Sequence, residues 1–258
     1  MKLAFKIQYK GTNYSGFQSQ KNANSIQDEL IKAFKGISVD NLQMNYSGRT
    51  DKGVHALGQV FDVVVSQDRS DMQWINGLNS NLPNDISVVD LERVEDSFHS
   101  RFDAIDRTYS YLIFNSPSRN VLLDDFYYWE QAELDINKMN EESKYLIGKH
   151  DFTSFRSLSC GSSNPERNVK KIEINKFGDI IEIKITANAF LQNMVRIIVG
   201  TLLEIGKYQI KISLKEILES KNRNNAGTTI NPRGLIFLGP SYGNITKLKP
   251  EKSPLIRI

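Results

Sequence analysis

Residues 46–60 bring together side chains that could do chemistry. They include three glycines, the cations Arg49 and Lys52, the acid Asp51 and His55. This density of glycines and polar residues is more than a plain turn requires. Two cations beside a carboxylate keep it ionised, because opposite charges about 4 Å apart interact by roughly 4 kcal/mol at an intermediate dielectric. We therefore predict that Asp51 acts as a nucleophile or a general base.

A structural role for Asp51 is the alternative. An aspartate that precedes Lys52 and Gly53 often accepts hydrogen bonds within its own turn. A surface that only binds phosphate groups gives no reason for an ionised acid, since the acid would repel them.

Other motifs indicate neither a metal site nor a cofactor. The three histidines lack the spacing of a helical metal pair. The glycine spacing around Asp51 resembles a phosphate-binding loop only as far as Val54, where a lysine should begin. Cys160 has no nucleophile motif around it and, as the sole cysteine, excludes an internal disulfide. We predict no metal and no cofactor.

Composition is that of a globular protein. The chain has 258 residues, of which 40% are apolar and 24% charged, and a formal net charge of +3. This mild basicity permits an anionic partner without requiring one. The N-terminus alternates apolar and cationic residues, and polar residues interrupt the most apolar segment, 187–206. We expect a soluble, cytoplasmic protein with no membrane partner.

Periodicity places the Asp51 segment between two strands of an α+β fold. In the first half we expect strands at residues 2–9, 42–46, 60–65 and 86–94, with helices after Ser25 and Ser70, both capping boxes. The second helix should bury Met72, Ile75 and Leu78. The second half predicts strands at residues 108–114, 169–174, 180–186 and 235–238, and helices marked by Ile136, Leu191 and Leu214.

Each half thus reads β-α-β-β-α-β, the ferredoxin-like (RRM-like) unit. We expect an N-terminal half of residues 1–105 with the catalytic loop, and a C-terminal half of residues 106–258 ending in a basic surface tail from residue 247. Open sheets of this kind combine most simply into one mostly antiparallel sheet with helices on one side and a central cleft.

Motifs along nearly the whole chain resemble those of the tRNA pseudouridine synthase A family. The segment Gly-Arg-Thr-Asp-Lys-Gly at residues 48–53 is similar to the family's signature. Further segments that resemble family motifs, in the family's order, are residues 9–18, 98–104, 107–109, 150–156, 167–169 and 188–196.

The resemblance implies an isomerase that converts uridine to pseudouridine without metal, nucleotide or redox cofactor. Asp51 would be the essential catalytic residue, by nucleophilic attack or by removal of a sugar proton; the sequence leaves both routes open. Arg196 would pair with it from the other half, although periodicity alone is also compatible with an arginine at the edge of an amphipathic helix.

The resemblance also implies residues that bind the substrate. Tyr109 would stack on the extruded base and Leu235 would pack against it, although both positions also suit a core. Arg49 would position RNA, and the loop of Phe17 and Gln18 would guide the tRNA, although this chain has Phe17 where the family usually has tryptophan. Arg107 precedes Tyr109 at the start of its strand and is a further candidate.

The implied substrates are uridines 38, 39 and 40 of the tRNA anticodon stem-loop, and the implied assembly is a homodimer. The alternative function is a non-catalytic tRNA-binding or tRNA-folding protein on the same scaffold, which should tolerate Asp51→Asn. A second alternative, an RNA glycosidase, would release uracil, whereas an isomerase conserves the mass of the RNA.

Overall fold

A computed structural model describes residues 1–40, 42–243 and 245–254. Its contacts divide the chain into two compact units. Unit 1 comprises Met1–Arg107 together with Ile236–Ile258, and unit 2 comprises Thr108–Leu235. The N-terminal boundary lies two residues beyond the one that we predicted. The last strand and the tail, however, group with unit 1, although the sequence pattern placed them in the C-terminal half.

Unit 1 contains four N-terminal strands with two helices, and the last strand of the chain. Its elements are β1 (Lys2–Tyr9), the 3-10 helix η1 (Gly11–Asn13), α1 (Ile26–Gly36), β2 (Met44–Tyr46), β3 (His55–Val64), α2 (Asp71–Asn79), β4 (Ile86–Val94) and β10 (Leu235–Ser241), of which Leu235 is counted with unit 2. The strands follow the order β4-β1-β3-β10, and β2 also pairs with β3. The pairing is antiparallel except between β10 and β3.

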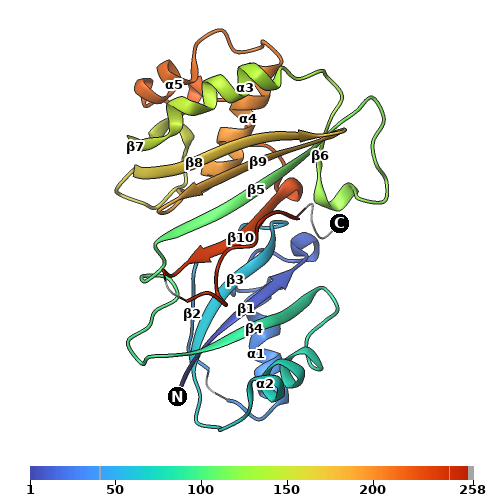
Figure 1. The fold of residues 1–258 in the computed structure, drawn as a ribbon, viewed down its shortest axis with the longest axis vertical. Helices are drawn as coiled ribbons and strands as arrows, with labels where there is room; N and C mark the ends of the chain where they lie inside the picture. The colour runs from blue at the N-terminus through green and yellow to red at the C-terminus, as the bar shows by residue number, and fades with distance from the viewer. Residues whose placement is uncertain (41, 244, 255–258) are drawn as a thin grey trace. The chain divides into compact units, whose positions relative to one another are not determined.

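Helices α1 and α2 cover one face of this sheet (Figure 1). Phe5 pairs with Phe61 across β1 and β3, and their rings stack 5.2 Å apart. Phe34 of α1 and Trp74 of α2 pack on Phe5 at ring distances of 5.6 and 6.3 Å. All four rings are fully buried, and each buried side chain of this size contributes about 1.5–3 kcal/mol.

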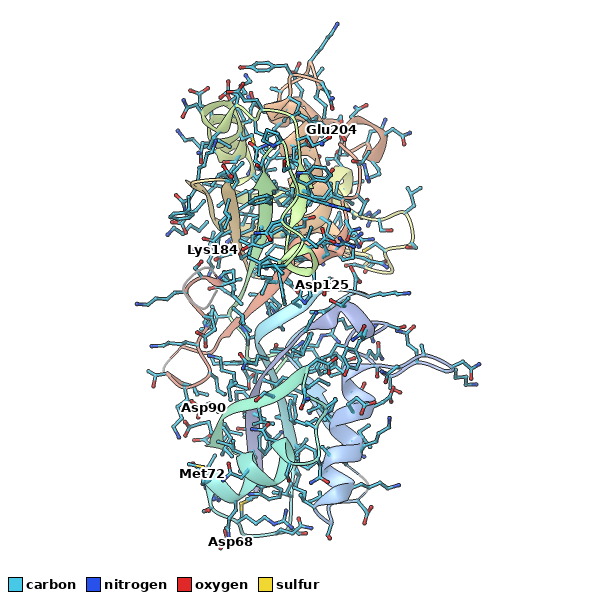
Figure 2. The ribbon with its side chains drawn as sticks, turned by 90° about the vertical axis from the view of Figure 1, so that its right-hand side faces the viewer. Asp68, Met72, Asp90, Asp125, Lys184 and Glu204 are labelled. Atoms are coloured by element: carbon cyan, nitrogen blue, oxygen red, sulfur yellow. The ribbon has the colours of Figure 1, made fainter. Side chains whose placement is uncertain are left out.

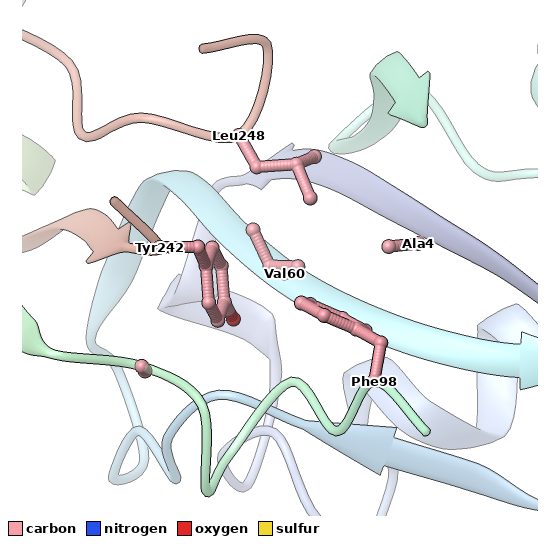
Figure 3. Close-up of a cluster of buried hydrophobic side chains, with 6 residues drawn as sticks. Ala4, Val60, Phe98, Tyr242 and Leu248 are labelled. Carbon is pink, nitrogen blue, oxygen red and sulfur yellow. The ribbon is translucent and has the colours of Figure 1, made fainter. Parts of the chain in front are cut away.

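The opposite face of the unit 1 sheet is covered by the chain that follows β10. A second apolar cluster forms there from Ala4, Val60, Phe98, Ala104, Tyr242 and Leu248 (Figure 3). Lys6, which points to the same face and is 5% exposed, donates to the Lys249 carbonyl at 2.9 Å and contacts the Glu251 carboxylate at 2.6 Å. The described part of the predicted surface tail is therefore packed on the sheet. Residues 255–258 of that tail lie outside the described residues.

Unit 2 contains the remaining strands and three α-helices. Its elements are β5 (Asp106–Asn115), η2 (Asp124–Phe126), β6 (Tyr128–Glu130), α3 (Ile136–Ser143), η3 (Lys144–Leu146), β7 (Gly148–Asp151), η4 (Thr153–Phe155), β8 (Glu166–Phe177), β9 (Ile180–Ala187), α4 (Met194–Gly206), α5 (Leu214–Ser220), η5 (Arg223–Asn225) and η6 (Pro232–Gly234). The strand order is β5-β9-β8-β7, with β6 parallel to β5.

Helix α4 is the centre of the unit 2 core. Eleven of its thirteen residues are buried, so it is apolar on nearly every side. Gly200 and Gly206 allow close approach: a Cβ on Gly200 would lie 2.0 Å from the Thr228 carbonyl oxygen, and one on Gly206 would lie 2.8 Å from the sulfur of Met139 in α3. The hairpin of β8 and β9 extends along the same unit in antiparallel register.

The α+β class and the mostly antiparallel strand pairing are confirmed, and β1 and β4 have the predicted bounds. Other details differ. Strands β6 and β7 were not predicted, and the bounds of β2, β5, β8, β9 and β10 differ from the predicted ones by one to three residues. Strand β3 begins at His55 rather than residue 60, because β10 pairs with its first residues. Met72, which we predicted to be buried, is 64% exposed and projects from α2 (Figure 2). Trp74 is the residue of α2 that is buried instead. Ser25 caps α1 as predicted, accepting from the Asp28 N–H at 3.2 Å. Its hydroxyl also donates to the Asp28 carboxylate, so these two residues do not form the reciprocal pair that Ser70 and Gln73 form.

Candidate active-site residues

The Asp51 loop in unit 1 is held against the loop that follows β1. The Phe17 N–H donates to the Thr50 carbonyl at 3.1 Å, and the Gly53 N–H donates to the Tyr14 carbonyl at 3.4 Å. Gly16 has φ of +102°, and a Cβ there would lie 2.7 Å from the Thr50 carbonyl oxygen. The close approach of the two loops therefore requires glycine at position 16.

Polar side chains fix the residues on either side of Asp51. The Tyr9 hydroxyl and the Thr50 hydroxyl lie 2.7 Å apart in the interior. Burial raises the pKa of the Tyr9 hydroxyl, so it stays neutral. On the far side, the Gly11 N–H donates to Nδ1 of His55 at 3.1 Å. His55 is 3% exposed and accepts through Nδ1, which is a structural role.

Gln59 holds the start of the same loop. Its fully buried amide accepts from the Ser47 hydroxyl at 2.6 Å and donates to the Gly48 carbonyl at 2.6 Å. The sequence analysis missed this residue. Its signal is a lone amide in a strand of mostly apolar residues, where a buried polar group needs partners.

Asp51 itself is partly buried, whereas Arg49 and Lys52 are exposed. The Val54 N–H donates to the Asp51 carbonyl at 3.2 Å, which closes a turn of the backbone. Arg49 Nε donates to the Tyr46 hydroxyl at 3.4 Å, a long contact on the surface. The loop therefore presents one acid between two accessible cations on a rigid backbone.

Phe17 lies beneath this loop and is fully buried. Its ring contacts those of Tyr46 and Tyr9 at 4.7 and 6.2 Å. A ring in this position supports the loop and has no surface on which an RNA base could stack. Gln18, the next residue, is partly exposed and remains available at the surface.

Arg107 also reaches the Asp51 loop. Its Nε and Nη2 both donate to the Ser47 carbonyl at 3.2 Å. Nη1 donates to the Ala104 carbonyl at 2.9 Å, and Nη2 donates to the Arg101 carbonyl. Three backbone carbonyls thus share one guanidinium, which makes Arg107 a positioning residue for two loops.

In unit 2, Arg196 is oriented by the start of its own helix. Its Nη1 donates to Oδ1 of Asn193 at 2.8 Å, and its Nε donates to the Ile230 carbonyl at 2.7 Å. Asn193, the N-cap, has a left-handed backbone with φ of 61°. The partly buried guanidinium therefore has a defined direction before any substrate is present.

Tyr111 contacts the segment of Ile230 and Asn231, which Arg196 also contacts. Its hydroxyl donates to the Asn231 carbonyl at 2.6 Å, one residue beyond the carbonyl that Arg196 uses. Burial raises the pKa of the Tyr111 hydroxyl, and the positive charge of Arg196 partly opposes that rise. The two side chains are thus neighbours in unit 2.

Tyr109 and Leu235 are both nearly buried in unit 2, at 9% and 5% exposure. The Tyr109 ring meets that of Phe190 edge to face at 5.1 Å. Before Leu235, a Cβ on Gly234 would lie 2.5 Å from the Leu112 carbonyl, so only glycine lets the chain pass β5 here.

The candidates are thus divided between the two units. Unit 1 brings Arg49, Asp51, Phe17, Gln18 and Arg107 around two adjoining loops, and unit 2 holds Tyr109, Arg196 and Leu235. Within the described part of the chain, no group of three or more His, Cys, Asp or Glu residues could hold a metal ion. None of the described helices is both long and apolar enough to span a membrane.

Comparison with known proteins agrees with this arrangement of motifs. A family model described as tRNA pseudouridine synthase matches residues 6–103 and 143–243. The tRNA pseudouridine synthase A of Francisella tularensis subsp. tularensis is 42% identical over 238 residues, 92% of this chain and 92% of that protein. The protein of the same name from Hydrogenovibrio crunogenus is 41% identical over 257 residues, 99% of this chain and 95% of that protein.

Among solved structures, a Cbf5-Nop10-Gar1 complex aligns with 78% of this chain and 54% of its own chain, at 10% identity and a TM-score of 0.36, a likeness too weak to carry an argument. The sequence relationship is decisive by itself, since the family model covers most of the chain. The chain therefore belongs to the tRNA pseudouridine synthase family, the isomerases that convert uridine in RNA to pseudouridine.

Proposed function

We propose that this protein converts uridines 38, 39 and 40 of the tRNA anticodon stem-loop to pseudouridine. The observation that carries the proposal is the acid Asp51 on a rigid loop between two accessible cations, in a chain of this family. The reaction breaks the bond from C1′ to N1, rotates the base and bonds C1′ to C5. The C5 proton leaves and N1 ends protonated, so the product is an isomer of the substrate.

Asp51 is the proposed catalytic residue. Whether it attacks as a nucleophile or removes a sugar proton, it must be ionised. Arg49 and Lys52 stand on either side of Asp51 in the sequence, and their positive charges favour its ionised form. The fixed backbone at Thr50, Gly53 and Val54 supports the role, because a positioned carboxylate loses little entropy on reaching the transition state.

Arg196 and Arg49 are the proposed supports of this acid. The guanidinium of Arg196 is held by Asn193 and Ile230 in unit 2, and its pairing with Asp51 is a proposal that rests on the family resemblance. A double-mutant cycle with Asp51→Asn and Arg196→Gln, with the free energy of unfolding as its readout, tests it. Non-additive effects on stability would support the pairing, and independent effects would contradict it.

The proposed substrate contacts are Tyr109 for stacking on the extruded base, Leu235 for packing against it and Gln18 for guiding the RNA. Stacking recovers part of the few kcal/mol that extrusion of a base costs. For Phe17 and Arg107 the proposed role changes. Both support the loops that meet the RNA, because Phe17 is fully buried and Arg107 is bonded to backbone carbonyls.

The working form that we propose is a cytoplasmic homodimer that binds tRNA and uses no cofactor. These points rest on the family resemblance. Sedimentation of the purified protein at micromolar concentration tests the dimer, since a monomer at that concentration would contradict it.

The test of function compares wild type with Asp51→Asn on unmodified tRNA, without added metal or nucleotide. Chemical labelling maps pseudouridine in the anticodon arm, and a gel-shift assay measures tRNA binding. Wild type alone should convert the uridines, while both proteins bind. Asp68→Asn, at an exposed aspartate of unit 1, is the matched control and should convert at the wild-type rate.

Three results would change the proposal. Conversion by Asp51→Asn at the wild-type rate would remove Asp51 from its catalytic role. Binding by both proteins with no conversion by either would favour the non-catalytic tRNA-binding function. Release of uracil, with loss of mass from the RNA, would indicate a glycosidase.

A further inference from the structure

We propose that Phe102 is a stacking platform for an unpaired base of the bound tRNA, with Arg101 beside it contacting the adjacent phosphate. The inference rests on the proposed function, because tRNA is the ligand. It concerns residues 98–104. This segment resembles a family motif, but the proposed chemistry gives it no role.

Phe102 is an aromatic side chain displayed to solvent. It is 71% exposed, whereas Phe98, four residues earlier, is buried in the apolar cluster (Figure 3). The ring of His99 lies 4.3 Å from that of Phe102, tilted by 48°, and the Arg101 guanidinium lies 5.5 Å from its centre. Single exposed apolar side chains are common on protein surfaces, so the distinguishing feature of Phe102 is the imidazole and the guanidinium beside its ring.

The loop that displays this ring is rigidly built. The Ser100 N–H donates to the buried Asp62 carboxylate at 2.8 Å, and the Tyr242 hydroxyl donates to the Ser100 carbonyl at 2.6 Å. The His99 N–H donates to the Asp103 carboxylate at 2.8 Å, which closes the turn. Because the backbone is fixed by buried groups, little entropy is lost when a ligand binds the ring.

The platform is tied to the proposed catalytic loop. Arg107 donates to the Arg101 and Ala104 carbonyls and also to the Ser47 carbonyl, four residues before Asp51. RNA that stacks on Phe102 is thus held by a loop whose position is fixed relative to the Asp51 loop within the same unit.

The chemistry of the patch favours RNA over a protein partner. Arg101 supplies a planar cation suited to phosphate. Nδ1 of His99 accepts from the Arg101 N–H at 3.1 Å, so Nε2 is the His99 nitrogen that could contact the ligand. An aromatic ring with a neighbouring cation is the usual platform for an unpaired base. Asp103, the acid of the loop, is engaged with the His99 N–H.

The test measures tRNA binding and pseudouridine formation by the full-length protein. Phe102→Ala should raise both the Kd and the KM for tRNA by roughly 5- to 100-fold, with a smaller effect on kcat. Phe102→Trp should restore wild-type values, because any aromatic face can stack. Arg101→Gln should lower the slope of log Kd against log salt by about 0.7 to 0.9, which is one phosphate contact.

Phe177→Ala is the matched control, since Phe177 is also an exposed phenylalanine, at the end of β8. It should bind tRNA as wild type does. Equal Kd values for wild type and Phe102→Ala would overturn the inference, as would a change in sedimentation without a change in Kd, which would indicate a protein contact. Binding that depends on Phe102 without conversion of uridine would uphold the platform and refute the proposed function.

Discussion

The ammonium of Lys6 lies 2.6 Å from the carboxylate of Glu251, although 245 positions separate them in the chain. Lys6 is 5% exposed and is the fifth residue of β1, between Phe5 and Ile7. Removing one partner of such a pair leaves a buried charge without compensation.

We therefore expect Glu251→Ala to lower the free energy of unfolding by about 2–4 kcal/mol. The double variant Lys6→Met/Glu251→Leu should recover most of that loss, because an apolar pair of similar size removes the desolvation penalty of both charges. Urea denaturation of the three proteins measures these differences. Equal stability of Glu251→Ala and wild type would show that this ion pair does not stabilise unit 1.

Gly16 allows the loop after β1 to contact the Asp51 loop. Gly16→Ala should destabilise unit 1 by about 1–3 kcal/mol and lower kcat, because the residue has φ of +102° and its Cβ would lie 2.7 Å from the Thr50 carbonyl oxygen. Thermal denaturation and single-turnover conversion of tRNA measure the two effects.

Gly48→Ala is the matched control for stability, since a Cβ there meets nothing within 4 Å. Its melting temperature should stay within about a degree of wild type. A larger loss of stability in Gly48→Ala than in Gly16→Ala would contradict the steric explanation.

Gln59 should matter for both stability and turnover. Gln59→Leu keeps much of the side-chain volume but leaves the Ser47 hydroxyl and the Gly48 carbonyl without their partner. We expect a loss of about 2–3 kcal/mol in stability and a fall in kcat larger than the change in KM, because the loop that carries Asp51 loosens. Unchanged kcat with reduced stability would mean that Gln59 supports the fold alone.

Buried tyrosines should make the protein sensitive to high pH. Burial raises the pKa of the Tyr9 and Tyr111 hydroxyls above their ordinary value near 10. The stability that each contributes is therefore complete below pH 10 and is lost as the pH rises from there towards the folded-state pKa. Each tyrosine adds a slope of about 1.4 kcal/mol per pH unit in that range.

Urea denaturation between pH 8 and pH 11.5 tests this for Tyr111. Tyr111→Phe should be less stable than wild type at pH 8, because the bond to the Asn231 carbonyl is lost, and the difference should shrink above pH 10. Tyr145→Phe, at a tyrosine that is 47% exposed, should leave the pH dependence unchanged. If the free energy of unfolding fell equally with pH for Tyr111→Phe and wild type, the prediction would be contradicted.

Local pattern was sufficient to predict most elements and the family. Strands β1 and β4 and the long helix α4 follow from apolar periodicity over eight or more residues, and the neighbours of Asp51 in the sequence made it the candidate for catalysis. These features can be predicted from the sequence because side-chain spacing and local charge do not depend on distant residues.

Tertiary structure decided which polar and aromatic residues support the site and which remain exposed. Phe17 is a core ring, Gln59 and Arg107 hold the backbone around Asp51, and the tail closes the second face of the unit 1 sheet over Lys6. Phe102 and Phe98 lie in one motif, yet one is exposed and the other buried. The bonds of Gln59, Arg107 and Lys6 reach residues 11, 60 and 245 positions away, and periodicity carries no information about such partners.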